Sequence, residues 1–159
     1  MKNSTIGIIT AFALIAFALV AVFLNRTGTP EETQADVDCD LSIVVAGVQS
    51  EGGSLYGMLC KEDENFPNSC EISQVVKAKE GTVKFDFSAI PNGIYAFAAY
   101  HDENGDQILN MSKNRYPSEG LVFSRNSMGP MGPPSFSQSS FELCKNRNLL
   151  ANIRYLENQ

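Results

Sequence analysis

The stretch VKFDFSAIPNGIYAFAAY, residues 83–100, decides the fold class that we expect for this chain. Its first five residues alternate apolar and polar side chains, which is the period-two pattern of a strand with one buried face. The residues Pro91-Asn92-Gly93 then form a turn. The run from Ile94 to Tyr100 is almost continuously apolar, which indicates a strand covered on both of its faces. The stretch therefore predicts a β protein.

Short apolar runs with turn residues between them predict further strands elsewhere in the chain. They lie at residues 41–45, 55–60, 72–78, 141–143 and 149–156. About seven strands at this short spacing are typical of a β-sandwich. A helix is the alternative for the last run, but the sequence offers no helix cap there. We therefore expect one all-β sandwich domain spanning residues 39–159.

A long segment between two of these runs, residues 102–140, is rich in Asn, Ser, Gly and Pro and poor in strand pattern. A loop of this length inside a compact domain is usually functional or disordered. The segment also contains large apolar residues that favour burial: Tyr116, Leu121, Val122, Phe123 and Phe136. We therefore expect an ordered excursion that packs against the sandwich.

The N-terminal residues 1–26 differ from the rest of the chain. Residues 6–24 carry no charged or strongly polar side chain except Thr10, and as an apolar helix they would span about 28 Å. That length fits a retained membrane anchor, whereas cleavage after Ala16-Phe17-Ala18 would leave the shorter apolar core of a signal peptide. Both alternatives export the remainder, so we expect an extracytoplasmic protein that meets the membrane only through residues 6–24. The polar residues 27–38 predict a linker.

The charge of the chain limits the partners that we expect. The formal charge is −6, and without Lys2 and Arg26 ten basic residues face 18 acidic ones, giving −8. Such a surface repels nucleic-acid phosphates and anionic lipids, so we expect no nucleic-acid partner. The leading interpretation is a non-enzymatic binding or structural module, with a protein or a glycan at the cell surface as its partner.

Four cysteines lie outside the apolar segment, and an even number in an exported domain predicts two disulfides. Cys60 and Cys70 flank one polar loop, which a local bridge would close at little entropic cost. Cys39 and Cys144 then form the second bridge, whose long loop would stabilise the fold by about 4 kcal/mol. A zinc site is the alternative, but the chain has no C-x-x-C pair and His101 is its only histidine.

One polar loop has the spacing of a cation site. Oxygen atoms at alternate positions of a tight loop can converge on a hard cation such as calcium. The candidate ligands are Asp102, Asn104, Asp106, the carbonyl of Ile108 and Asn110, with Glu119 as a further ligand from outside the loop. The twelfth position holds Lys113 rather than Glu, so the loop is not an EF-hand. The alternative is an Asx-rich turn, in which the same side chains cap backbone N–H groups.

The pair His101 and Asp102 offers an enzymatic alternative. A small hydrolase could use these two residues with Ser124 or Ser135 as the nucleophile. The chain has no G-x-S-x-G motif, and a single histidine beside an acidic turn is more often structural, with its ring bonded to a loop carbonyl. An enzyme would need His101 exposed in a pocket and within hydrogen-bond reach of the nucleophile.

Several short motifs occur in an order that resembles one bacterial family. They are IPNGIYA at residues 90–96, YHDENGD at residues 100–106, PSEG at residues 117–120, FS at residues 123–124 and GPPSF at residues 132–136. Together they resemble the DUF2141 family of exported bacterial proteins, over residues 40–156 of this chain. The resemblance implies an immunoglobulin-like or prealbumin-like β-sandwich. It implies no activity, because the family has none assigned.

Overall fold

A computed structural model describes residues 38–156 of the chain. The predicted apolar helix within residues 1–26 lies outside the described residues, as do residues 27–37 of the predicted linker. Within residues 38–156, no helix is long and apolar enough to cross a membrane.

Strands dominate the described residues, with one short α-helix and one turn of 3-10 helix. The strands are β1 (Cys39–Val48), β2 (Ser54–Cys60), β3 (Ile72–Lys77), β4 (Gly81–Ile90), β5 (Gly93–Asp102), β6 (Gly120–Phe123), β7 (Phe141–Leu143) and β8 (Arg147–Asn152). The helices are η1 (Ser124–Asn126) and α2 (Phe136–Ser139). The prediction of an all-β fold is therefore confirmed.

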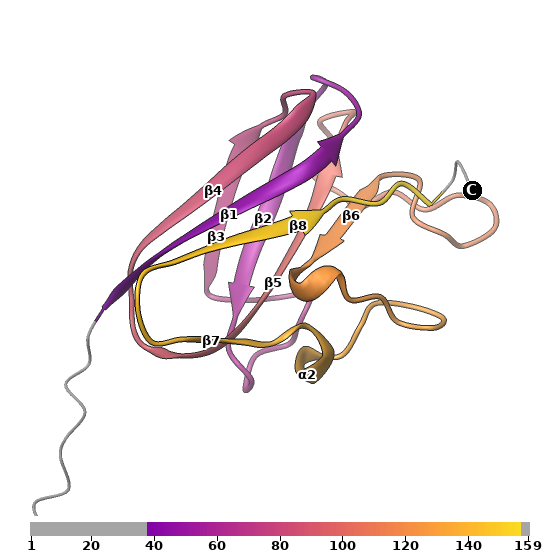
Figure 1. Cartoon of the computed structure of the whole chain (residues 1–159). Coiled ribbons are helices and arrows are strands. Elements are labelled where there is room, and N and C mark those ends of the chain that lie inside the picture. Colours follow the sequence, from indigo (N-terminus) through magenta and orange to yellow (C-terminus); the bar gives the residue numbers. More distant parts are fainter. Residues whose placement is uncertain (1–37, 157–159) are drawn as a thin grey trace, which may run out of the picture. The chain divides into compact units, whose positions relative to one another are not determined.

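The strands form two sheets (Figure 1). The three-stranded sheet has the order β4-β1-β8, with β1 antiparallel to β4 and parallel to β8. The five-stranded sheet has the order β3-β2-β5-β6, and β7 pairs with the beginning of β5. The stretch at residues 83–100 supplies β4 to the first sheet and β5 to the second, so the turn at residues 91–93 carries the chain from one sheet to the other.

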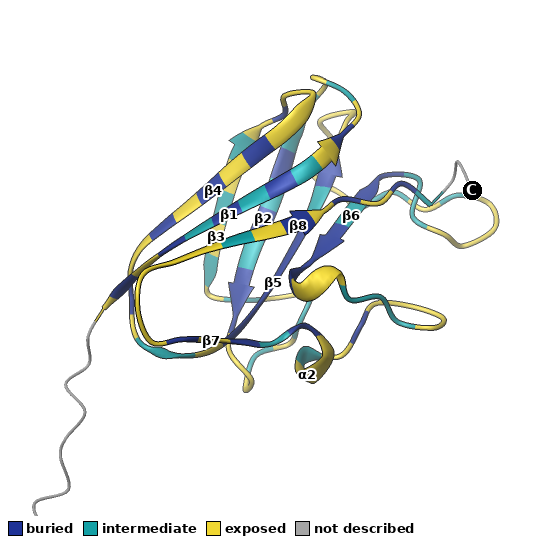
Figure 2. Ribbon diagram, viewed as in Figure 1, coloured by how far each residue is buried: buried dark blue, intermediate teal, exposed yellow. Residues whose placement is uncertain are grey.

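The apolar faces of the two sheets share one core. Buried residues alternate with more exposed ones along β1 and β4, as the alternating colours of Figure 2 show. Phe85 and Phe87 of β4 contact Phe97 of β5, with ring centroids 5.2 and 6.2 Å apart. Gly57 of β2 leaves room for the Phe85 ring, because a Cβ atom at this position would clash with that ring. This packing fixes the position of β5, from whose end the candidate site begins.

The excursion at residues 102–140 contributes β6, η1 and α2, of which the strand β6 was not predicted from the sequence. Val122 and Phe123 are buried, and Phe66 packs edge-on against both Phe123 and Phe136, with ring centroids 6.1 Å apart in each case. The excursion therefore adds an outer layer of apolar contacts to the five-stranded sheet.

Two details of the sequence predictions are wrong. Tyr116 was expected to be buried, but its side chain is 61% exposed. It belongs to a loop that is closed by a bridge between Met111 and Pro117 outside both sheets, so the core cannot cover it. The last strand, β8, spans residues 147–152 rather than 149–156, and its parallel pairing with β1 excludes the helical alternative.

The predicted disulfide between Cys60 and Cys70 is confirmed, with the two Cα atoms 5.0 Å apart. It closes the connection between β2 and β3. Within that connection, Asn65 and Ser69 form an additional antiparallel bridge. The loop is therefore held both by the covalent link and by its own backbone.

The predicted disulfide between Cys39 and Cys144 is not formed. Cys39 is buried at the start of β1 in the three-stranded sheet, whereas Cys144 follows β7 on the five-stranded sheet. β7 ends at the buried Leu143, and Cys144 is exposed in the bend that follows it. The prediction paired the two cysteines by elimination, and elimination carries no information on which way each side chain points.

Candidate functional site

The candidate cation loop begins at Asp102, the last residue of β5, whose side chain is buried. Asp102 Oδ1 accepts hydrogen bonds from the backbone N–H groups of Gly105 (2.7 Å) and Asp106 (3.2 Å). Asp102 Oδ2 accepts a third bond from the N–H of Gln107 (2.9 Å). Gly105 has a φ of 78°, which glycine adopts without strain, so the loop can turn tightly over the carboxylate.

Three further side chains of the loop meet one another. Asn104 Nδ2 donates to Asp106 Oδ2 (3.0 Å) and to Asn110 Oδ1 (2.7 Å). Asn110 Nδ2 also donates to Asp106 Oδ2 (3.0 Å). The bond from Asn110, the N–H of Ile108 and the bond from Asn104 together hold the pKa of Asp106 below its usual value. One carboxylate and two amide groups thus lie within hydrogen-bond distance of one another.

Glu119 joins the two ends of the loop. It lies just before β6, and its side chain is buried. Its Oε1 accepts a hydrogen bond from the N–H of Glu103 (3.3 Å), and its Oε2 accepts one from the N–H of Asn110 (3.0 Å). The pairing of β6 with β5 places Glu119 beside the loop although it is distant from Asp102 in the sequence. The buried carboxylates of Asp102 and Glu119 therefore both bind backbone N–H groups of the loop.

The structure brings the predicted ligands together in part. Asn104, Asp106 and Asn110 meet directly, whereas the carboxylates of Asp102 and Glu119 bind backbone N–H groups. This is the pattern that the Asx-rich turn predicts. Among residues 38–156, no three His, Cys, Asp or Glu side chains are grouped so that they could hold a metal ion. Calcium binding stays a prediction.

His101 is fully buried next to the end of β5. Its Nε2 lies 2.8 Å from the carbonyl oxygen of Gly52, and its Nδ1 lies 2.7 Å from the hydroxyl of Tyr155. A carbonyl oxygen can only accept, so we assign the proton to Nε2 and the accepting role to Nδ1. The N–H of Gln49 donates to the same Tyr155 hydroxyl (3.2 Å). These bonds tie the C-terminal segment to the connection between β1 and β2.

Sequence reasoning missed Tyr155, which is buried against His101. Burial raises the pKa of the Tyr155 phenol, and the negative charge of Glu103 raises it further, while the N–H of Gln49 acts in the opposite direction. The only signal in the sequence is the alternation of Ile153 and Tyr155 with a polar residue, which continues the strand period beyond β8.

Neither serine that the hydrolase alternative required is bonded to His101. Ser124 Oγ accepts a hydrogen bond from the N–H of Phe97 (3.0 Å) and donates one to a carbonyl of α2 (2.6 Å). Ser135 caps α2, where its hydroxyl accepts a hydrogen bond from the N–H of Gln138 (3.4 Å). The exposed base and nucleophile that a hydrolase would need are therefore not brought together by the described residues.

The motif order noted in the sequence spans the strands and the candidate loop described above. A family profile whose description is "Uncharacterized protein conserved in bacteria (DUF2141)" matches residues 43–150. The chain belongs to the DUF2141 family. The matched range contains β2 to β7 completely, together with the loop between Asp102 and Glu119. No curated protein and no solved structure matches the chain.

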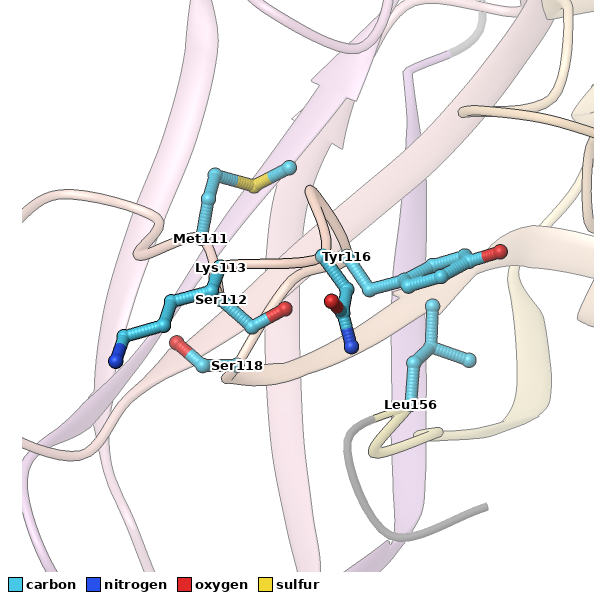
Figure 3. A pocket seen from close by; sticks show the side chains of 7 residues that line it. Met111, Ser112, Lys113, Tyr116, Ser118 and Leu156 are labelled. Carbon is cyan, nitrogen blue, oxygen red and sulfur yellow. The ribbon is translucent and has the colours of Figure 1, made fainter.

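A pocket of about 940 Å³ lies beside the segment that directly follows the candidate loop of this DUF2141 chain (Figure 3). Its lining combines one ammonium group, several polar groups and three apolar side chains. The lining residues are Met111, Ser112, Lys113, Asn114, Tyr116, Ser118 and Leu156. Met111 is 56% exposed and Tyr116 is 61% exposed, so the pocket presents apolar surface to solvent.

Proposed function

We propose that this DUF2141 chain is an extracytoplasmic binding or structural module, which residues 1–26 deliver either as a cleaved signal peptide or as a retained membrane anchor. The apolar run at residues 6–24 supports export. The disulfide between Cys60 and Cys70 supports an oxidising compartment, where such bridges persist. The formal charge of −6 argues against a nucleic-acid partner.

We also propose that the domain is an immunoglobulin-like or prealbumin-like β-sandwich. Two sheets with one shared core support this assignment. In a sandwich, the connecting loops gather at the ends of the sheets, where they can change without disturbing the core. The candidate loop leaves the end of β5, so it is the place at which we expect function.

The observation that carries the binding role is the presence of exposed apolar side chains next to a loop whose backbone is bound by two buried carboxylates. Met111 and Tyr116 line the pocket and are 56% and 61% exposed, and Ile108 of the neighbouring loop is 63% exposed. Apolar side chains that gather on a surface mark interaction sites, whereas single ones need no explanation. The carboxylates of Asp102 and Glu119 fix the backbone beside them, and a fixed backbone lowers the entropic cost of binding. The partner that we propose is a protein or a glycan at the cell surface.

We expect Tyr116→Ala to weaken binding by about tenfold or more, because exposed tyrosines are frequent anchors of interfaces. The measurement is the retention of the full-length protein on immobilised glycans of the bacterial envelope. Leu150→Ala is the matched control, since this side chain is 62% exposed on β8 and lies outside the proposed surface. Equal losses in the two variants, or no retention of the wild type on any glycan, would contradict a glycan site at this surface.

We propose in addition that the loop takes up a calcium ion, held by oxygens of Asp102, Asn104, Asp106, Ile108 and Asn110. Oxygen ligands of this kind are those that calcium prefers. An ionised carboxylate offers about four acceptor sites. Asp102 uses three of these sites for backbone N–H groups, so one is left for a cation. Such an ion would brace the loop beneath the proposed binding surface rather than perform chemistry.

Calcium is expected to raise the melting temperature of the protein by about 5 °C at a concentration tenfold above the dissociation constant, because binding to the folded state then contributes about 1.4 kcal/mol. Thermal unfolding with calcium and with chelator measures this difference. Asp106→Asn should abolish most of the shift, whereas the control Asp86→Asn removes an exposed carboxylate of β4 and should retain it. Identical melting temperatures with calcium and with chelator would exclude the ion.

A further inference from the structure

The chain contains two Asn-Gly dipeptides, Asn92-Gly93 and Asn104-Gly105. At such a pair, the backbone nitrogen of the glycine can attack Cγ of the asparagine side chain. A bond forms between that nitrogen and Cγ, the bond from Cγ to Nδ2 breaks, and the nitrogen's proton leaves with the side-chain amide as ammonia. Water then opens the resulting succinimide ring to aspartate or isoaspartate. Glycine favours the attack because it has no Cβ to hinder the required turn of the backbone.

At Asn104, every group that this reaction needs is held by a hydrogen bond. The attacking nitrogen, that of Gly105, donates its proton to the buried Asp102 carboxylate over 2.7 Å. The leaving group, Asn104 Nδ2, donates to Asn110 Oδ1 (2.7 Å) and to Asp106 Oδ2 (3.0 Å). The remaining atom, Asn104 Oδ1, accepts the N–H of Asp106 (2.9 Å). The asparagine side chain therefore cannot rotate toward Gly105 without breaking several bonds.

The Asp102 carboxylate opposes the attack for a second reason. The glycine nitrogen becomes nucleophilic when it loses its proton, and a negatively charged acceptor beside it makes that loss less favourable. Asp102 is 1% exposed, so water screens its charge poorly. The same carboxylate thus holds the attacking nitrogen in place and keeps it protonated.

The Asn92 side chain has no comparable restraint, although Gly93 begins β5 and pairs with Leu143 of β7. It lies in the turn between β4 and β5 and is half-buried. Within residues 38–156, no hydrogen bond holds its side chain. The Tyr95 hydroxyl donates to the carbonyl of Pro91 (2.9 Å), a bond that does not involve the Asn92 side chain.

We propose that Asn92 is the site at which the folded chain deamidates, and that the Asp102 carboxylate protects Asn104 from the same reaction. Conversion at Asn92 adds one negative charge to the turn between the two sheets. In the isoaspartate product it also lengthens the backbone of that turn by one methylene. Asn104 becomes reactive only when the loop opens, as it does in the unfolded chain.

The test follows both sites by peptide mass mapping of the full-length protein, incubated at mildly alkaline pH with and without denaturant. Under native conditions we expect Asn92 to convert and Asn104 to stay intact. In denaturant both sites should convert at similar rates, because the restraint on Asn104 is then lost. Conversion of Asn104 as fast as Asn92 in the folded protein would overturn the proposal, and so would an intact Asn92.

Two variants test the effect of the Asp102 carboxylate on deamidation at Asn104. Asp102→Asn should accelerate the conversion of Asn104 by about tenfold or more, since loss of a hydrogen bond to a charged group favours opening of the loop by at least that factor. Asp86→Asn is the control, because it removes a carboxylate that does not contact the loop. An unchanged rate at Asn104 in folded Asp102→Asn would contradict the protecting role. If that variant does not fold, the comparison of native and denatured wild type decides the question.

Discussion

We expect His101→Ala to lower the free energy of unfolding by about 4 kcal/mol, because it combines a cavity with the loss of two hydrogen bonds made by a buried ring. His101 is fully buried, and its ring joins the Gly52 carbonyl to the Tyr155 hydroxyl. Alanine would leave both groups without this partner, and the bond to Tyr155 is lost in a buried place. Urea denaturation, followed through the loss of β structure, measures the change.

Tyr155→Phe is the matched variant, since it removes one hydroxyl and keeps the ring in the core. It should cost about 1–2 kcal/mol, because the Nδ1 of His101 and the N–H of Gln49 each lose one partner. The double variant should lose less than the sum of the two single losses, since the residues share a bond. Strict additivity, or a loss below about 1 kcal/mol in His101→Ala, would show that this network does not stabilise the fold.

Gly53→Ala is expected to lower the free energy of unfolding by about 3 kcal/mol or more. Gly53 has a φ of 64°, and a Cβ atom at this position would overlap the backbone carbonyl of Asp102. Backbone cannot move aside as a flexible side chain can, so β2 and β5 must separate where the candidate loop begins. The same denaturation experiment measures the loss.

Gly81→Ala separates the cost of the backbone conformation from the cost of the steric overlap with Asp102. Gly81 also has a positive φ, of 92°, but a Cβ atom there would meet no other atom within 4 Å. This variant should therefore show only the cost of the backbone conformation, about 1 kcal/mol. If Gly53→Ala and Gly81→Ala lose the same stability, the close approach of Gly53 to Asp102 contributes nothing.

The two expectations concern contacts that the sequence pattern does not reveal. His101 follows an apolar strand and Asp102 precedes a polar loop, so sequence reasoning could propose a catalytic pair as readily as a structural one. Tyr155 lies 54 residues away from His101, and the bond between them depends on how the C-terminal segment packs. Likewise, Glu119 could be named as a ligand from outside the loop, but its bonds to both ends of the loop follow from the pairing of β6 with β5.

By itself, the sequence determined what depends on near neighbours. The alternation in residues 83–87 and the turn at residues 91–93 predicted β4 and β5, because the period of side chains along a strand is local. The bridge between Cys60 and Cys70 was predictable because the two cysteines are only ten positions apart. The Asx-rich character of the loop after Asp102 was visible for the same reason.

Only the tertiary structure decided which distant segments meet and which way their side chains point. It buries Cys39 and exposes Cys144, exposes Tyr116, and encloses His101 between Gly52 and Tyr155. The physical reason is that a local period states whether a side chain lies on the apolar face of its strand, but not which strand lies opposite. That choice depends on the packing of the whole core, which sums contacts between residues far apart in the chain.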